Sequence, residues 1–147
     1  MIQIEIISPT DKIDFSKKEE VAAFLFKHLD QYGDPKEDIM KCLDYALSPE
    51  MSRGGGLVVL AREEGKIVGA VVLNETGMSG YIPEYILVYI AVDNSQRGKG
   101  IGKKLMQKAI ENANGDIALH VEPDNPAKKL YESLGFTNKY LEMRLKK

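Results

Sequence analysis

An apolar segment at residues 85–92, YILVYIAV, runs directly into a glycine-rich basic segment at residues 95–105, SQRGKGIGKKL. The apolar segment has no polar alternation, which is typical of a strand covered on both faces in the middle of a sheet. From Gly102 onward apolar residues recur at helical spacing, so the sequence predicts a buried strand, a glycine turn and a helix in succession. The free N–H groups at the start of such a helix attract anions, and glycines let the backbone approach a ligand closely. This succession predicts a phosphate-binding turn.

The rest of the chain predicts a mixed α/β fold in a single domain that spans residues 1–147. Strands are expected at 2–7, on either side of a polar turn at 63–66, at 85–92, at 117–121 and, as a shortened last strand, at 139–147. Helices are expected at about 17–31, 35–47, 102–113 and 126–134. Ser16 and Asp34 are the expected N-caps of the first two helices. The expected order is strand, two helices, three strands, helix, strand, helix, strand.

Composition limits the partners and the cellular setting. The formal net charge of -2 argues against a protein that coats nucleic acid, since such domains carry a strong basic excess. The single cysteine, Cys42, excludes an internal disulfide and a thiolate cluster for zinc, so we expect no metal and a reducing cytoplasm. The first residues do not resemble a signal peptide, and the longest apolar run is too short to span a bilayer. We therefore expect a cytoplasmic protein without nucleic acid or membrane as partners.

The glycine spacing excludes two common nucleotide-binding loops. A Walker loop requires Gly-Lys-Ser/Thr, whereas Lys103 is followed by Lys104. The dinucleotide fingerprint G-x-G-x-x-G fails because Gly98, Gly100 and Gly102 are evenly spaced, and because two helices and a hairpin precede this unit. The phosphate-binding turn is therefore of another kind.

The pattern R-x-x-G-x-G is present at Arg97, Gly100 and Gly102. With this pattern the sequence resembles the GNAT superfamily of N-acetyltransferases, in which a loop of this form binds the pyrophosphate of acetyl-CoA. A second family signature, an Asn-containing turn followed by L-Y and G-F, is matched within residues 125–136. The resemblance covers nearly the whole chain. It implies one acyl-CoA N-acyltransferase domain that moves an acetyl group from acetyl-CoA to a primary amine by direct attack in a ternary complex. A non-catalytic CoA-binding sensor or partner module is the alternative.

The resemblance also implies which residues bind acetyl-CoA. The pyrophosphate loop would comprise Arg97, Gly98, Lys99, Gly100, Ile101, Gly102 and Lys103. The pantetheine arm would pair with the main chain of Ile90 and Val92 as an added strand. Lys103, Lys104 and Lys128 are either ligands of the 3′-phosphate or solvated helix lysines. Asn125 or Asp124 either contacts the cofactor or caps the last helix.

Three residues are implied in acid–base catalysis. Tyr131 occupies the family's general-acid position and would protonate the departing thiolate, unless it only packs between helix and sheet. Glu84 and His120 are the two candidates for the general base, acting directly or through a water. Each has a plain alternative: Glu84 as a solvated acid at a strand edge and His120 as a structural histidine.

The acceptor site is less defined, because the chain ends soon after Phe136 whereas many family members end in a long β-hairpin. Its walls are expected from the second helix, the SRGGG loop at 52–56 and the ETGMSGYIP loop at 75–83. A group of acids either favours a cationic amine, on a small molecule or a protein, or forms a solvated face: Asp34, Glu37, Asp38, Asp44 and Glu50. Cys42 is expected to be a small buried hydrophobe rather than an acetyl carrier. The exposed sheet edges are compatible with a homodimer.

Overall fold

A computed structural model describes residues 1–49 and 54–147 of the chain. The described strands are β1 (Ile2–Ile7), β2 (Gly56–Glu63), β3 (Lys66–Glu75), β4 (Tyr85–Val92) and β5 (Ile117–Leu119). The described helices are α1 (Phe15–Leu29), α2 (Lys36–Ala46), α3 (Ile101–Asn112) and α4 (Ala127–Ser133), with 3₁₀ turns at Pro9–Asp11, Asp30–Tyr32 and Asn94–Gln96. The expected order of elements is confirmed as far as α4.

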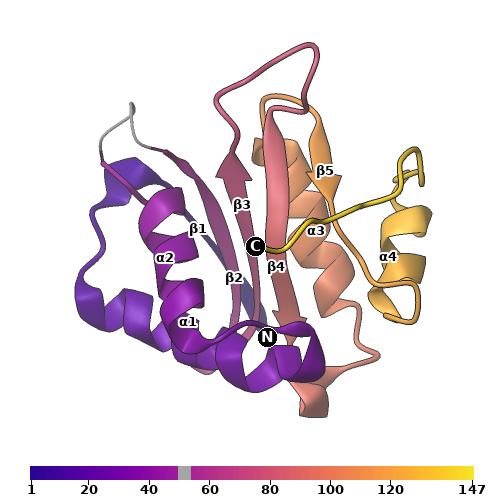
Figure 1. The fold of residues 1–147 in the computed structure, drawn as a ribbon. Coiled ribbons are helices and arrows are strands. Elements are labelled where there is room, and N and C mark those ends of the chain that lie inside the picture. The colour runs from indigo at the N-terminus through magenta and orange to yellow at the C-terminus, as the bar shows by residue number, and fades with distance from the viewer. Residues whose placement is uncertain (50–53) are drawn as a thin grey trace.

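The described strands form one mixed sheet in the order β1-β2-β3-β4-β5 (Figure 1). β1 to β4 are antiparallel neighbours, whereas β5 runs parallel to β4. The β2–β3 hairpin turns at Glu64 and Gly65, which both have positive φ, at 52° and 80°. Two successive positive φ angles are the mark of the tight turn that matches the twist of two antiparallel strands. The mixed α/β class that the sequence predicts is confirmed.

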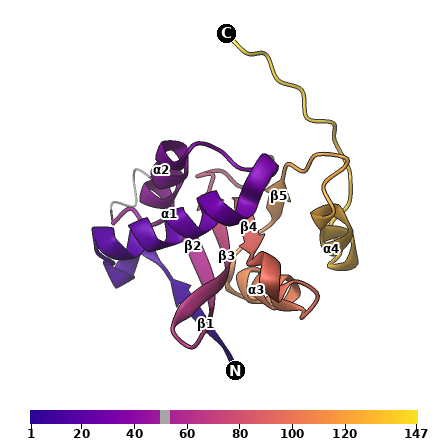
Figure 2. The same cartoon turned by 90° about the horizontal axis from the view of Figure 1, so that it is seen from below.

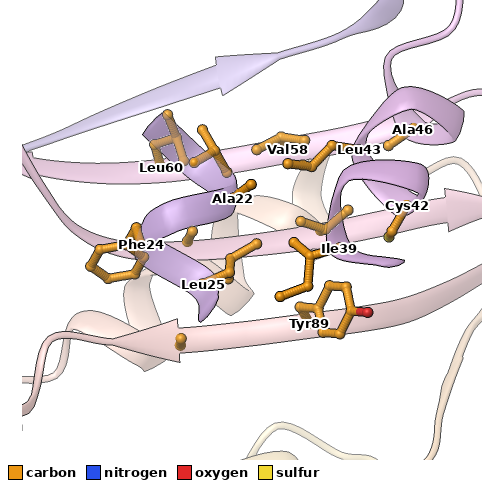
Figure 3. Close-up of a cluster of buried hydrophobic side chains, with 14 of the residues drawn as sticks. Ala22, Phe24, Leu25, Ile39, Cys42, Leu43, Ala46, Val58, Leu60 and Tyr89 are labelled. Carbon is orange, nitrogen blue, oxygen red and sulfur yellow. The ribbon is translucent and has the colours of Figure 1, made fainter. Parts of the chain in front are cut away.

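Helices cover both faces of the sheet. α1 and α2 pack on one face and α3 on the other, while α4 lies beyond β5 (Figure 2). Leu25, Ile39 and Leu43 are 0% exposed in the core on the α1/α2 side, where Leu25 and Ile39 lie near Tyr89 and Leu43 lies near Val58 (Figure 3). Leu105 of α3 is likewise fully buried on the opposite face. Burying a side chain of this size contributes about 1.5–3 kcal/mol, so the two cores hold the sheet from both sides.

A β-bulge in β4 changes the face on which its side chains lie. Val72 of β3 pairs with Tyr89, but the next residue of β3 pairs with Leu87, so Val88 is the extra residue of the bulge. Leu87 consequently lies in the α3-side core and Tyr89 in the α1/α2-side core. The residues between the buried positions of β4 are half-buried or, like Ile86, exposed. The prediction that both faces of this strand are covered is therefore only partly right, because β4 residues lie in the cores on both faces but Ile86 is exposed.

The expected N-caps of the first two helices are both wrong. α1 begins at Phe15, one residue before its expected cap Ser16, and Asp14 is the N-cap because its side chain accepts a hydrogen bond from Lys17 N at 2.9 Å. Pro35 is the N-cap residue of α2. Asp34 instead accepts a hydrogen bond from the Tyr89 hydroxyl. For α1, Asp14 and Ser16 are both residue types that cap helices, so residue type alone does not decide between them. For α2, the carboxylate of Asp34 is bonded to Tyr89 instead of to the helix.

The expected strands at the C-terminal side are also shorter than predicted. β5 ends at Leu119 rather than at residue 121. The predicted strand at 139–147 is absent, and these residues are exposed. A strand pattern becomes a strand only beside a neighbouring strand, and this segment has none among the described residues. None of the described helices has the length and apolar character needed to cross a membrane.

Candidate functional site

The site begins at a fork between β4 and β5. The two strands pair only from Tyr85 to Leu87, and beyond that point the β5 side of β4 has no strand beside it among the described residues. Asp93 N donates to Val68 O of β3. Because successive residues of a strand point their N–H and C=O groups to opposite sides, those of Ile90 and Val92 face the open side. These two residues therefore offer an extended ligand a free strand edge.

The glycine loop follows directly on this edge. Asp93 shapes the exit from β4, since its carboxylate accepts hydrogen bonds from Ser95 N at 2.9 Å and Ser95 Oγ at 2.8 Å. Gly98 and Gly100 have φ of 84° and 77°, a region that residues with a Cβ rarely adopt. A Cβ at either position would meet no atom within 4 Å. The loop thus needs glycine for its backbone path, and its surface is open to a ligand.

The N-terminus of α3 is directed into this loop. Gly100 is its N-cap and has no side chain to satisfy the first N–H groups of the helix. A Cβ on Gly102 would lie 3.4 Å from Leu130 and 3.7 Å from Val92. The first turn of α3 is therefore packed between the end of β4 and α4. This contact brings together the two sequence motifs, which are separate in the chain.

Basic side chains surround the open helix terminus. Arg97, Lys99, Lys103 and Lys104 are exposed around it, and Lys99 Nζ donates to Gln96 at 3.0 Å. Lys128 of α4 is half-buried. Free N–H groups, a helix dipole and cations together suit a phosphate or pyrophosphate group. The residues present thus fit the phosphate part of a CoA molecule.

Tyr131 is placed at the side of this site by α4. It is 6% exposed, and its ring lies 5.8 Å from the ring of Phe136, centroid to centroid. Phe136 N donates to Tyr131 O at 3.0 Å, which closes the end of α4. Burial raises the pKa of the Tyr131 hydroxyl to about 12. Its proton is therefore retained at neutral pH, which is the protonation state that a general acid requires.

Glu84 has backbone partners at the other end of β4. Its carboxylate accepts hydrogen bonds from Asp116 N at 2.7 Å and Gly80 N at 3.2 Å. These bonds to backbone N–H groups lower the pKa of Glu84 below its usual value. Glu84 also lines a cavity of about 290 Å³ with Glu75 and Tyr85, at the end of β4 remote from the glycine loop. The carboxylate thus ties the β3–β4 loop to the start of β5, and a lowered pKa makes it a weaker base.

We expect Glu84→Gln to lower the melting temperature at pH 7 while changing kcat less than the removal of a general base does. The folded carboxyl has a lower pKa than the unfolded one, for which 4.5 is the usual value, so its stabilisation is present above pH 4.5. It is lost as the pH falls further through the folded-state pKa. The melting temperatures of the two proteins should therefore converge at acidic pH, which calorimetry between pH 3 and pH 7 measures. A loss of kcat of roughly 100-fold or more, as for removal of a base, would contradict the structural role.

His120 follows β5 directly, at the opening of the fork. Ile117, Leu119 and Val121 pack against the α3-side core, so His120 between them lies toward the α1/α2 side. Its side chain is 63% exposed, and Nδ1 lies 4.0 Å from the carboxylate of Glu142. His120 is thus accessible on the face opposite to the α3-side core, in which Tyr131 is buried.

The asparagine of the second motif stabilises the start of α4. Asn125 Oδ1 accepts a hydrogen bond from Ala127 N at 2.9 Å, so its side chain serves the first turn of the helix. Asp124 is exposed. The N-cap residue of α4 is Pro126, so Asn125 supports the start of the helix from one position before the cap.

Cys42 is buried on the α1/α2 side. It is 9% exposed, and burial raises the pKa of its thiol to about 11. Asn74 Nδ2 donates to its sulfur at 3.6 Å. A buried neutral thiol suits the small apolar role that the sequence predicts.

Glu50, Ser52 and Arg53, which the sequence predicts on the acceptor side, lie outside the described residues.

Sequence reasoning missed the hydrogen bond between Tyr89 and Asp34. The Tyr89 hydroxyl donates to Asp34 Oδ2 at 2.5 Å and so ties the α1–α2 connection to β4 just past the bulge. Burial and the neighbouring Asp34 carboxylate raise the pKa of Tyr89 far above its usual value. No signal in the local sequence marks this contact, because the bulge that directs Tyr89 to this face depends on the register of β4 against β3.

We expect Tyr89→Phe to lower the free energy of unfolding by about 1.5 kcal/mol, the usual contribution of a hydrogen bond to a charged group. Chemical denaturation measures it. Tyr81→Phe is the matched control, since Tyr81 is 79% exposed in the β3–β4 loop. Equal midpoints for the two variants would mean that the Tyr89–Asp34 bond contributes nothing.

Comparison with known proteins agrees with this geometry. Residues 54–138, more than half of the chain, match the family model described as an acetyltransferase (GNAT) domain. The N-alpha-acetyltransferase RimI of Mycobacterium tuberculosis (strain ATCC 25618 / H37Rv) is 33% identical over 101 residues, which cover 67% of this chain and 63% of RimI. The 5-NmdU N-acetyltransferase of Pseudomonas phage PaMx11 is 32% identical over 92 residues, covering 61% of this chain and 64% of that enzyme. The chain thus spans less than two thirds of the length of either relative.

A solved structure shares the fold. The aminoglycoside N-acetyltransferase AAC(6')-Iy, determined in complex with CoA, superposes with a TM-score of 0.69 at 18% identity, covering 100% of this chain and 96% of that one. The family match covers the fork, the glycine loop and α4. The chain therefore belongs to the GNAT acetyltransferase family.

Proposed function

We propose that the protein is an acetyl-CoA-dependent N-acetyltransferase in which a primary amine attacks directly within a ternary complex. The observation that carries the proposal is the packing of Gly102 between Val92 and Leu130, which joins the open edge of β4, the bare N-terminus of α3 and the helix of Tyr131 in one site. Family membership supports the same activity.

The glycine loop and α3 would hold the co-substrate. Backbone N–H groups from Arg97 to Lys103 would bind the pyrophosphate, and the exposed lysines nearby would bind the 3′-phosphate. The free main-chain groups of Ile90 and Val92 would pair with the pantetheine arm as an added strand. When bound, acetyl-CoA supplies the thioester whose acetyl carbon the amine attacks.

Two chain groups would assist the transfer. An N–H group on the open edge of β4 would donate a hydrogen bond to the thioester oxygen, where negative charge develops. The Tyr131 hydroxyl, which keeps its proton because its pKa is about 12, would donate that proton to the departing sulfur. The roles of these groups rest on their place at the fork and on the family resemblance.

The base that neutralises the attacking amine would be His120, directly or through a water. His120 is exposed beside the fork, whereas the carboxylate of Glu84 accepts two backbone N–H bonds that lower its pKa. His120→Gln should therefore reduce kcat by roughly 100-fold or more, and Glu84→Gln by much less.

The acceptor would be a primary amine, and a cationic one is favoured. Asp34, Glu37 and Asp38 are exposed where α2 begins, on the same face as His120. The proteins named above are an N-alpha-acetyltransferase, a 5-NmdU N-acetyltransferase and an aminoglycoside N-acetyltransferase, so the type of amine varies within this similarity.

The test combines binding and turnover. Calorimetric titration with acetyl-CoA measures binding, and release of free thiol is then followed with a panel of peptide N-termini, polyamines and aminoglycosides. Binding with amine-dependent thiol release is the expected result. Binding without release on any amine would favour a non-catalytic CoA-binding module, and a failure to bind would overturn the proposal.

A further inference from the structure

His28 is a buried histidine whose ring has an unpaired nitrogen. It lies in the last turn of α1 and is 8% exposed, and its ring is 4.6 Å from the ring of Phe24, centroid to centroid. In the part of the chain that the structure describes, its Nδ1 is the one buried side-chain polar atom without a hydrogen-bond partner. Native folds rarely leave such an atom unpaired. This imidazole is therefore a candidate for a role beyond packing.

The imidazole lies close to the point where β4 passes into the glycine loop. α1 packs on β3 and β4 (Figure 1). Phe24 belongs to the same buried cluster as Ala91, which is two residues before Asp93. Asp93 is the charged group that acts most strongly on His28, and Arg97 of the glycine loop acts on it as well. His28 is thus coupled by charge to the segment that follows β4.

The protonation of His28 depends on opposing effects. Burial lowers its pKa below the usual 6.5, so the imidazole is neutral at pH 7 in the free protein. Asp93 and Asp30 favour the protonated form. Lys27 and Arg97 oppose it. The dipole of α1 favours a positive charge in the last turn of the helix. A further anion near this group would therefore shift the balance toward the protonated form.

CoA would bring such an anion to the glycine loop. Its pyrophosphate is a dianion, and charges act on one another over about 10 Å at moderate ionic strength, and further where they are shielded from water. We propose that His28 takes up a proton when the CoA phosphates occupy the glycine loop, so that acetyl-CoA binds more tightly as the pH falls from 7.5 toward 5.5. Linkage requires this reciprocity, because a ligand that favours protonation is bound more tightly by the protonated form. The inference rests on the proposed function, since it requires CoA at this loop.

NMR titration with dephospho-CoA tests the proton uptake. This ligand keeps the pyrophosphate but lacks the 3′-phosphate, a phosphate monoester whose second pKa near 6 would titrate in the same range. The chain has two histidines, so the variant His120→Gln retains His28 as its one imidazole. The pKa of His28, measured in this variant between pH 5 and pH 8, should rise by about 0.5 or more when dephospho-CoA saturates the protein.

Calorimetric titration measures the consequence for affinity. The His120→Gln protein should bind dephospho-CoA about twofold more tightly at pH 5.5 than at pH 7.5. The matched variant carries His28→Phe in addition, which keeps an aromatic ring beside Phe24 but cannot take up a proton. Its affinity should change less over the same range, by this factor of about two. Circular dichroism establishes that this variant is folded, and the NMR titration does not depend on it.

The outcomes separate this inference from the proposed function. A pKa of His28 that stays the same in the presence of bound dephospho-CoA would overturn the inference and leave the proposed function in place. The same pH dependence of affinity with and without His28 would do so equally. A wild-type chain that binds neither dephospho-CoA nor acetyl-CoA would overturn the proposed function, and the inference with it.

Discussion

Tyr131→Phe should lower kcat by roughly 100- to 1,000-fold while leaving the KM for acetyl-CoA little changed. The substitution removes only the hydroxyl, and the ring that packs 5.8 Å from Phe136 stays in place. A loss confined to kcat is the expected sign of a group that acts in the transition state rather than in binding. Steady-state kinetics of thiol release measure it, with Tyr81→Phe, at an exposed tyrosine, as the matched control.

The same pair of proteins should differ at alkaline pH. Burial raises the pKa of Tyr131 from the usual 10 to about 12, so the folded state holds this proton more tightly than the unfolded state does. The wild type should therefore lose stability as the pH rises from 10 toward 12, and Tyr131→Phe should lose less. A kcat for Tyr131→Phe within a few-fold of the wild type would contradict the acid role and leave Tyr131 as a packing residue.

Gly100→Ala should weaken acetyl-CoA binding at least tenfold, a change of about 1.4 kcal/mol. The N-cap of α3 has φ of 77°, a conformation that costs a residue with a Cβ about 1–2 kcal/mol. Alanine would either shift the loop or place a methyl group in the open surface in front of the helix terminus. Either change displaces the N–H groups that would bind the pyrophosphate. Calorimetric titration measures the Kd.

Gly77→Ala is the control for backbone strain. Gly77 has φ of 79°, and a Cβ there would also meet no atom within 4 Å, but it lies in the β3–β4 loop at the other end of β4. Both variants should lose similar stability, and only Gly100→Ala should lose affinity for acetyl-CoA. Equal affinities of the two variants would show that the loop does not bind the phosphates.

The sequence alone predicts the elements whose signals are local. The alternation in β1, the polar hairpin turn between β2 and β3, and the helical spacing in α3 each depend on residues that are neighbours in the chain. The glycine loop belongs to the same group, because the conformations of Gly98 and Gly100 need glycine whatever surrounds them. For this reason the class of the fold and the position of the glycine loop could be predicted.

The parts that could not be predicted depend on contacts between distant segments. The bulge at Val88 arises from the register of β4 against β3, and it turns Tyr89 toward Asp34, which lies 55 positions away in the chain. Glu84, a candidate base on sequence grounds, has its carboxylate bound by backbone N–H groups of Asp116 and Gly80. Local patterns carry no information on such pairings, since many registers and partners satisfy the same alternation.

The C-terminal half of the chain shows both what the local sequence determines and what tertiary contacts decide. Sequence determined that β4, a glycine turn and α3 follow one another, because backbone conformation and hydrophobic spacing are local properties. Only the tertiary structure decided that β5 leaves β4 after three residues, that Gly102 packs between Val92 and Leu130, and that residues 139–147 stay out of the chain's own sheet. Strand pairing and helix packing join segments far apart in the chain, so their outcome depends on the free energy of the whole fold.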